Sequence, residues 1–463
     1  MQTIFWHDYE TFGVDTKKDK PSQFAGVRTD LDLNIVGSPL TLYCKPSEDS
    51  LPSPDACLVT GITPQTAMQE GVVEAEFAKA IHTVFSAPGT CVAGYNSVRF
   101  DDEVSRNLFY RNFYDPYERE WKNGNSRWDI IDMLRLCHAV RPEGIVWPTR
   151  EDGVVSFRLE QLTKANGLLH DAAHDALSDV HATIAMAKLI KQKQPRLYDH
   201  VFSLRAKQQA LEALALGSQK AVLHISSKFS SELGCGSLIL PVVAHPKNKN
   251  EIICIDLRYS PQPIFDLDAE TLRQLLFTKV EALPEGIERI PIKSVHINRC
   301  PIVLTSSLID DEVAQRLSIS MDSCEAHRQQ CIAFTELAEK LQAVVGGLAF
   351  DNSGKEAESL LYDGFISNQD KAAIRNVPHM LGDELFKGTY SFEYARLPDL
   401  LFRYRARNFS DSLSDDEVQE WQEYCREKLL LGSDSSLTET LARLEKNEFS
   451  VEVTGNGEKV LSS

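Results

Sequence analysis

The chain has 463 residues, 43% of them apolar and 25% charged, which suits a soluble protein of two or three domains. No run of about 18 apolar residues occurs, and no basic start is followed by an apolar block, so neither a membrane span nor a signal peptide is expected. The formal net charge of −18, taken alone, argues against a nucleic-acid partner, because phosphate binding needs lysine and arginine.

Strand-like and helix-like segments alternate over the first part of the chain, which is an α/β pattern. We expect strands near 3–6, 41–44 and 91–96, and helices over 74–85, from 101, and over 178–190. The stretch 192–195 is a plausible first domain boundary, because it ends a helical pattern at a proline.

The pattern changes beyond that boundary. One more helix over 204–216 is followed by strand-like segments at 221–225, 238–244, 252–257 and 295–304. Short strands separated by turn residues predict a small β-rich domain, with a barrel as one form. Helices are expected again from about residue 312, a second boundary near 350–355, and helices onward to about 448.

The ten cysteines include no CxxC pair, and most lie inside apolar segments. Reduced, buried thiols in a cytoplasmic protein explain them best, and no Cys/His cluster has the spacing of a zinc site. The charge is uneven. Residues 410–463 hold 13 acidic and 5 basic side chains, whereas residues 97–141 hold eight of each. A local channel can therefore oppose the negative net charge.

The stretch WHDYETFG follows the first predicted strand and places Asp8 and Glu10 two residues apart. Side chains two apart on a strand point to the same face. Two like charges at one site repel each other unless a cation neutralises them, and carboxylate oxygens suit Mg²⁺ or Mn²⁺. The pair alone is a weak signal, since a strand that has simply reached solvent would read in the same way.

Two further acidic positions follow. Asp101 comes after a strand and opens a helix, where Asp102 and Glu103 also fit as helix cap or dipole partners. His174 lies just ahead of the helix over 178–190, and Asp179 lies in its first turns. A core or capping histidine is the alternative for His174. Asp175 is a candidate N-cap for this helix.

The order Asp8, Glu10, Asp101, His174, Asp179 resembles the DEDD exonuclease superfamily, in the subclass whose last motif is H-x4-D. Longer stretches together resemble bacterial exonuclease I: WHDYETFG, GYNSVRFDDEVSRNLFYRNFYDPY, NSRWDIIDMLR, RPEGIVWP, SFRLEQLTKANG, AHDALSDVHATIAMAKL, VHINRCP, YDGFIS and RYRARNF. The resemblance covers nearly the whole chain and is weakest over 340–395 and in the C-terminal tail.

The resemblance implies an α/β fold in three parts. These are an RNase H-like DEDDh exonuclease domain (1–194), an SH3-like β-rich domain with flanking helices (195–349) and a C-terminal helical domain (350–463). In the family they form a C-shaped molecule around a groove. A groove too narrow for a duplex would explain single-strand preference and processive action. The implied activity is 3′→5′ digestion of single-stranded DNA to 5′-mononucleotides, in DNA repair and recombination.

The resemblance also implies the mechanism. Asp8, Glu10, Asp101 and Asp179 would hold two Mg²⁺ ions, for which Mn²⁺ can substitute, and these ions would stabilise an in-line displacement. His174 would be the general base that takes a proton from water, a role that suits histidine because the ordinary pKa of this residue type lies near working pH. Glu10 and His174 would also contact the substrate.

The implied DNA contacts lie in several parts of the chain. Arg158 would bind the substrate, and its alternative role is a surface ion pair with Glu160 or another nearby acid. Residues 97–141 hold eight aromatic and eight basic residues, a composition that suits stacked bases and a phosphate backbone, although most of the aromatics, such as Phe109 and Phe113, are expected in the core. The positions that match family contacts are Arg106, Tyr117, Trp121, Arg135, His200, Asn250, Lys293 and His296. At position 200 the family can carry an aromatic residue, which stacks better than imidazole.

Arg403, Arg405 and Arg407 form a basic cluster on one predicted helix. It could meet DNA, or the acidic tail of single-stranded-DNA-binding protein, a partner in the family. It could also pair with the acidic C-terminal segment of this chain, and we favour this internal pairing. We expect a monomer. Two alternative functions stay open: a DEDD-type ribonuclease or proofreading enzyme, and a catalytically inactive DNA-binding scaffold.

Overall fold

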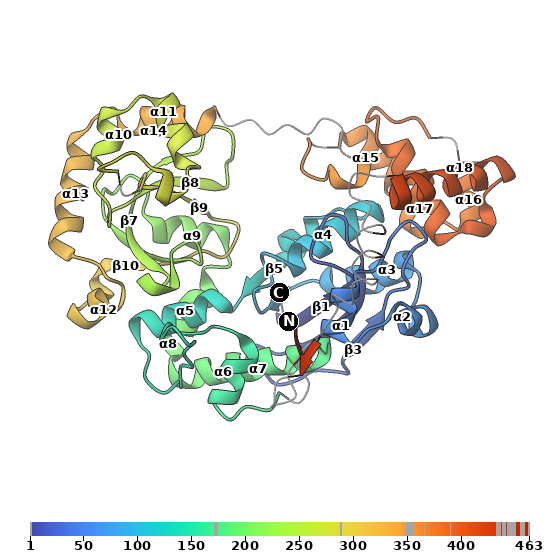
Figure 1. Ribbon diagram of the computed structural model, residues 1–463, viewed down its shortest axis with the longest axis horizontal. Coiled ribbons are helices and arrows are strands. Elements are labelled where there is room, and N and C mark those ends of the chain that lie inside the picture. Colours follow the sequence, from blue (N-terminus) through green and yellow to red (C-terminus); the bar gives the residue numbers. More distant parts are fainter. Residues whose placement is uncertain are drawn as a thin grey trace. The chain divides into compact units, whose positions relative to one another are not determined.

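The computed structural model describes residues 2–170, 175–287, 289–347, 356–364, 366–388 and 390–431, with residues 437, 441, 451–453 and 459–461 (Figure 1). The chain falls into two compact units. The first comprises Met1–Ser126, His170–Ile184 and Asn352–Ser463, and the second comprises Arg127–Leu169 and Ala185–Asp351. One five-stranded sheet lies mainly in the first unit, and a second lies within the second unit.

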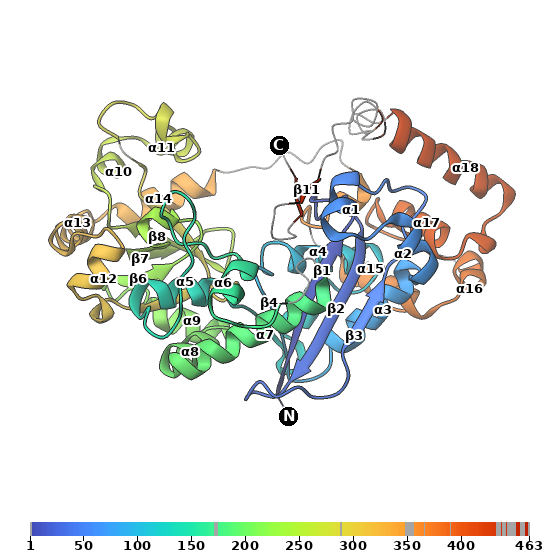
Figure 2. The same cartoon turned by 60° about the horizontal axis from the view of Figure 1, so that its bottom comes forward.

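The first unit is built on four neighbouring strands in the order β3-β2-β1-β4 (Figure 2). They are β1 (Thr3–Thr11), β2 (Pro21–Thr29), β3 (Leu40–Tyr43) and β4 (Thr90–Gly94). The strand β1 pairs antiparallel with β2 and parallel with β4, so both of its edges are covered. The sequence pattern did not reveal β2. Nearly all of its residues are buried, and a strand buried on both faces lacks the alternation that betrays a half-exposed one.

Helices and aromatic side chains complete this part of the first unit. The helices are α1 (Pro54–Thr60), α2 (Pro64–Glu70), α3 (Glu74–Phe85), α4 (Asp101–Arg111) and the first half of α7 (Ala176–Lys193), with short 3-10 turns η1 (Glu118–Glu120) and η2 (Lys122–Gly124). Phe5 and Phe24 of the sheet pack with Phe77 and Phe85 of α3 and with Phe109 of α4. This core holds the face of β1 that carries Phe5 and Tyr9 against the helices.

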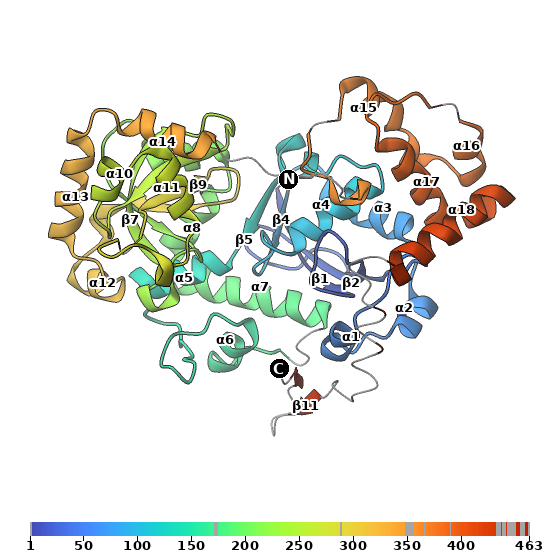
Figure 3. The same cartoon turned by 45° about the horizontal axis from the view of Figure 1, so that its top comes forward.

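The C-terminal helices belong to the same unit and lie together in Figure 3. They are α15 (Asn368–Ile374), α16 (Gly382–Lys387), α17 (Leu397–Asn408) and α18 (Asp415–Arg426). Tyr110 and Phe113, at the end of α4, share one buried cluster with Leu361, Leu400 and Tyr404. The C-terminal segment is thus packed against the end of α4 in the same unit. Farther on, β11 (Val451–Val453) pairs antiparallel with β12 (Lys459–Leu461).

The second unit holds a five-stranded antiparallel sheet in the order β10-β6-β7-β8-β9. The strands are β6 (Val222–Ile225), β7 (Gly236–Ala244), β8 (Glu251–Asp256), β9 (Ile292–His296) and β10 (Ile302–Thr305). The prediction of one strand over 295–304 is therefore wrong. A turn containing Cys300, with φ of 47°, separates two strands that lie at opposite ends of the sheet order. Short apolar runs on either side of a turn look continuous in a sequence.

Helices make up most of the remaining second unit. They are α5 (Ile131–Val140), α6 (Leu159–Ala165), α8 (Pro195–Ser203), α9 (Lys207–Leu214), α10 (Gln262–Asp266), α11 (Ala269–Leu276), α12 (Asp311–Arg316), α13 (Met321–Ala333) and α14 (Leu337–Gly346). The strand β5 (Ser126–Asp129) precedes α5 and comes next to β4 as the fifth strand in the order of the first sheet. The helix predicted over 204–216 is only α9, since α8 ends at Ser203. No helix of the described chain is long and apolar enough to cross a membrane. All ten cysteines are free thiols.

Candidate active site

Three carboxylates meet at one end of the first unit's sheet. Asp8 and Glu10 lie on β1, and Asp179 lies in the first turn of α7. Each offers an oxygen, and these atoms all lie within 4.8 Å of one another. The prediction that Asp8 and Glu10 point together is confirmed, because both contribute to this one cluster.

The neighbouring strand fixes the start of α7 at this place. In the sheet register Glu10 lies opposite Gln23 of β2. The side-chain oxygen of Gln23 accepts a hydrogen bond from the backbone N–H of Ala176 at 3.3 Å. Asp175 accepts from the backbone N–H of Ser178 at 3.0 Å, as an N-cap does, so this expected role is confirmed. Asp179 is consequently held over β1.

Asp101 is the first residue of α4 and reaches the site because the turn after β4 places the start of this helix beside β1. A Cβ on Gly94 would lie 2.7 Å from the Cβ of Ser97 and 3.1 Å from the carbonyl of His7, so glycine allows this turn to close against β1. Asp101 is buried, and its Oδ1 accepts from the backbone N–H of Tyr9 at 3.1 Å. It borders the three-carboxylate cluster while being anchored to the strand that carries it.

The electrostatics of the cluster are those of a site that needs a cation. Burial raises the pKa of Asp8 well above its ordinary value, and the carboxylates of Asp101 and Glu10 raise it further. Burial, with Asp179 and Asp101, raises the pKa of Glu10 to about 9. Crowded carboxylates are hard to ionise together, and a bound divalent ion removes that cost. Three oxygen donors of this kind fit Mg²⁺ or Mn²⁺.

A histidine that the sequence did not single out contacts the cluster. The Nε2 atom of His170 lies 2.5 Å from Oδ1 of Asp179. His174, the predicted general base, lies outside the described residues. The stretch HDAAH contains two histidines, His170 and His174. The H-x4-D spacing to Asp179 selected His174 and gave no reason to examine His170.

Three of the predicted DNA contacts lie in the first unit. Trp121 is 65% exposed and Tyr117 is half-buried. Arg106 is only 4% exposed, and four of its five N–H donors bind protein groups. The N–H groups of Nε and Nη2 donate to the carboxylate of Glu120. The two N–H groups of Nη1 donate to Glu103 and to the hydroxyl of Tyr362. Contact of Arg106 with DNA stays a prediction.

Three more lie on helices of the second unit or directly before one. Arg158, just before α6, is exposed and makes no ion pair with Glu160 in the described part of the chain. Arg135 is mostly buried, donates to Asp132 at 2.5 Å and lies over the ring of Phe157. His200 on α8 has its Nε2 2.9 Å from the carbonyl of Val303. Of the three, Arg158 presents the most accessible cation.

The last three predicted contacts lie on the antiparallel sheet of the second unit. Lys293 and His296 are both on β9, and Asn250 immediately precedes β8, the strand that pairs with β9. The ammonium group of Lys293 lies 4.3 Å from the ring centroid of Phe229, and burial lowers the pKa of this lysine to about 8. All three residues thus lie on or next to the paired strands β8 and β9, although Lys293 and His296, three positions apart on β9, point to opposite faces of that strand.

The basic cluster on α17 pairs internally. Arg405 donates to Glu417 of α18 at 2.8 Å, which confirms pairing with the acidic C-terminal segment for this residue. Arg407 behaves differently, because it binds Asp49 at 2.6 Å and also Glu358. Its guanidinium is paired with buried carboxylates outside the acidic C-terminal segment. The prediction that Arg407 pairs with that segment is therefore wrong.

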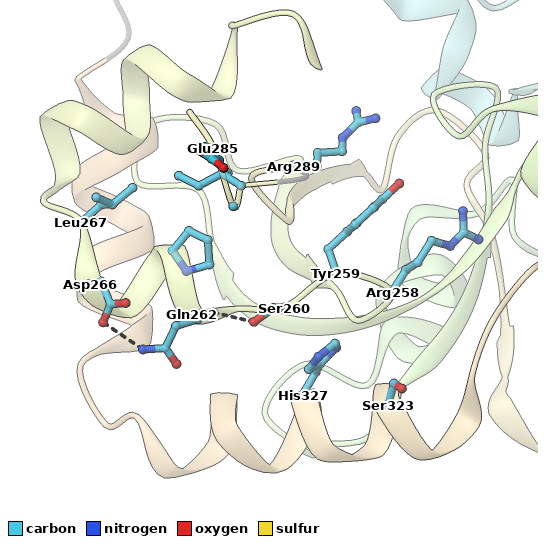
Figure 4. A pocket seen from close by; sticks show the side chains of 13 residues that line it. Arg258, Tyr259, Ser260, Gln262, Asp266, Leu267, Glu285, Arg289, Ser323 and His327 are labelled. Carbon is cyan, nitrogen blue, oxygen red and sulfur yellow. Dashed lines mark hydrogen bonds between the residues drawn. The ribbon is translucent and has the colours of Figure 1, made fainter. Parts of the chain in front are cut away.

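A separate cavity of about 530 Å³ lies in the second unit (Figure 4). Its wall carries both charge signs, with Arg258 and Arg289 on one part and Asp266 and Glu285 on another. Arg258 is already bound to the carbonyls of Gly236 and Leu317. The cavity does not contain the carboxylate cluster.

Comparison with known families covers almost all of the chain. Residues 5–187 match the family described as Exonuclease, residues 205–346 the Exonuclease I SH3-like domain, and residues 355–462 the Exonuclease I C-terminal domain. The sequence is 44% identical to exodeoxyribonuclease I of Escherichia coli over 427 residues, which is 92% of this chain and 90% of the relative.

Solved structures agree with this match. Exonuclease I from Methylocaldum szegediense superposes with a TM-score of 0.92 at 48% identity, covering 99% of this chain and 97% of that one. E. coli exonuclease I in complex with a dA16 oligonucleotide gives a TM-score of 0.92 at 43% identity, covering 96% and 95%. Further similar structures are a zinc-bound E. coli complex with single-stranded DNA and an SSB/exonuclease I complex.

Proposed function

The chain belongs to the exonuclease I family, and we propose that it is an exodeoxyribonuclease that removes 5′-mononucleotides from the 3′ end of single-stranded DNA. The observation that carries the proposal is the carboxylate cluster of Asp8, Glu10 and Asp179, bordered by Asp101, in a chain that matches these relatives along nearly its full length. The cluster supplies the ligands that phosphodiester hydrolysis by this superfamily needs.

The carboxylate donors would suit Mg²⁺, and two such ions would supply charge stabilisation for an in-line displacement at phosphorus. Asp8, Glu10 and Asp179 would bind the ions through the oxygens that converge within 4.8 Å. Asp101 would hold a fourth position, since the N–H of Tyr9 fixes its carboxylate beside β1. His174 would accept the proton of the attacking water.

Single-stranded DNA is the proposed substrate, and similar structures were solved with such oligonucleotides. Arg158, Glu10 and His174 would each contact the substrate. The other proposed DNA contacts, taken from the family match, are Arg106, Tyr117, Trp121, Arg135, His200, Asn250, Lys293 and His296. We also propose that the enzyme digests DNA processively and that it acts in DNA repair in the cytoplasm.

Single-stranded-DNA-binding protein is a proposed partner, because a similar solved structure pairs SSB with exonuclease I. We expect the enzyme itself to act as a monomer, since a groove within one chain can supply processivity. Light scattering on the purified protein checks this expectation, and a stable dimer would contradict it.

The test uses purified protein with 3′-labelled and 5′-labelled single-stranded DNA in Mg²⁺, beside matched RNA and duplex. The expected result is shortening from the 3′ end with release of mononucleotides, and loss of this activity in Asp8→Ala. Preference for RNA would favour the ribonuclease alternative. Binding without cleavage in both Mg²⁺ and Mn²⁺ would favour an inactive scaffold.

A further inference from the structure

His170 lies in the first unit with its ring almost wholly buried. Its side chain is 6% exposed, whereas the neighbouring Leu169 is 81% exposed. Burying a polar imidazole beside an exposed leucine costs free energy unless the ring gains a specific hydrogen bond. The contact between Nε2 of His170 and Oδ1 of Asp179, at 2.5 Å, supplies such a bond.

This hydrogen bond runs from the imidazole to the carboxylate. An ionised carboxylate has no proton to donate, so Nε2 is the donor whenever Asp179 carries its charge. A carboxylate oxygen has two lone pairs. Oδ1 therefore keeps one lone pair for a cation, and Oδ2 keeps both. The contact with His170 is thus compatible with a role of Asp179 as a metal ligand.

The backbone and the carboxylate of Asp179 are held by different groups. The buried Gln23 accepts from the backbone N–H of Ala176, and the backbone N–H of Asp179 donates to the carbonyl of Asp175 at 3.0 Å. These bonds place the first turn of α7 but leave the side-chain torsions of Asp179 free. In the described part of the chain, no lysine or arginine pairs with this carboxylate, and His170 is the side chain that hydrogen-bonds to it.

We propose that His170 is a positioning residue for the metal site, because its Nε2–H holds the carboxylate of Asp179 where an oxygen converges with those of Asp8 and Glu10 within 4.8 Å. This inference rests on the proposed metal-dependent hydrolysis and adds a residue outside the carboxylate cluster and distinct from His174. Hydrogen bonds from outside the ligand set orient a ligand before the ion binds, and losing one costs about 10–100-fold in metal affinity.

The experiment titrates the metal-free, full-length protein with Mn²⁺ and follows the free ion by electron paramagnetic resonance, with no DNA present. His170→Phe keeps a flat ring without an N–H donor, whereas His170→Gln keeps an N–H donor on a side chain of similar reach. The matched control is His181→Phe, which replaces an exposed histidine on α7. Unfolding midpoints and binding of a fluorescent oligothymidylate are measured in EDTA for each variant. His170→Ala replaces a phenylalanine variant that unfolds.

We expect His170→Phe to bind Mn²⁺ about 10-fold or more weakly, with His170→Gln and His181→Phe within about threefold of the wild type. Cleavage by His170→Phe should need correspondingly more metal for its half-maximal rate. Its DNA binding in EDTA should be unchanged, because the residue acts on a metal ligand and not on the strand.

Three results would overturn the positioning role of His170. The first is a lower unfolding midpoint with unchanged Mn²⁺ affinity in His170→Phe, which indicates packing alone. The second is an equal loss of affinity in His170→Gln. The third is tighter Mn²⁺ binding by His170→Phe, which means that the ring competes with the ion for Asp179. A wild-type protein that binds Mn²⁺ without cleaving single-stranded DNA would overturn the proposed function and leave the role of His170 standing.

Discussion

Arg407 of α17 and Asp49 form a two-pronged ion pair although 358 positions separate them, with Nε–Oδ1 at 2.9 Å and Nη2–Oδ2 at 2.6 Å. Both side chains are almost wholly buried. Lys428 adds a third contact to Oδ2 of Asp49 at 2.8 Å. The C-terminal helices are thereby held to the N-terminal part of the same unit by buried ion pairs as well as by apolar packing.

Removing Arg407 should strongly destabilise the protein. Arg407→Met leaves Asp49 and Glu358 buried without their main partner, and breaking a buried pair on one side costs about 3–5 kcal/mol. Urea unfolding measures the change. The matched control is Arg426→Ala, whose side chain is 63% exposed in a surface pair, and its change should stay below about 1 kcal/mol. Equal stability of the two variants would contradict a central role for the buried pair.

Acid should weaken the fold through Glu74. Burial by itself would raise the pKa of this carboxyl, but Arg111 and Lys20 outweigh it and lower the pKa from 4.5 to about 2. A folded pKa below the unfolded one gives stability that is present above pH 4.5 and lost as pH falls toward 2, about 3 kcal/mol in all. Unfolding curves from pH 6 to pH 2 should show this loss in the wild type. Glu74→Gln should flatten it, while the exposed Glu76→Gln on the same helix should leave it intact.

The carboxylate cluster should lower the stability of the metal-free protein and raise it when a divalent ion binds. In EDTA, Glu10→Gln should melt at a higher temperature than the wild type. The pKa of Glu10 is raised to about 9 by burial and by Asp179 and Asp101, so folding pays to hold this carboxyl in the site, and glutamine removes that cost. Mg²⁺ should stabilise the wild type by about 2.7 kcal/mol at 100 times the dissociation constant. The variant should gain less. Glu76→Gln serves as control, and a variant that gained as much from Mg²⁺ as the wild type would argue against a ligand role for Glu10.

Arg158 should contribute a phosphate contact. Its guanidinium is exposed and lacks an ion pair with Glu160 in the described chain, so it can reach a substrate strand. Arg158→Gln should weaken binding to all single-stranded sequences alike and make the salt slope shallower by about 1. Anisotropy titrations in EDTA measure this. Arg150→Gln removes an exposed arginine that is already paired with Asp152, and no change in slope is expected for it.

Much of the chemistry was readable in the sequence. The D-x-E spacing on a strand predicts that Asp8 and Glu10 share a face, and the structure confirms it. The helix that carries Asp179 and its Asp175 cap also follow from local pattern. The motif order identified the family over nearly the whole chain. These features depend on neighbours in sequence, where side-chain period and capping chemistry act directly.

Other features needed the folded chain. The strand β2 has no alternating pattern, and the run over 295–304 splits into strands at opposite ends of a sheet. The sequence by itself determined the carboxylate set and the family. Only the tertiary structure decided that Arg407 finds Asp49, that Arg106 is occupied by protein carboxylates, and that Tyr362 lies beside Tyr117. The physical reason is that such partners are chosen by packing and desolvation between distant segments, and no local periodicity records that choice.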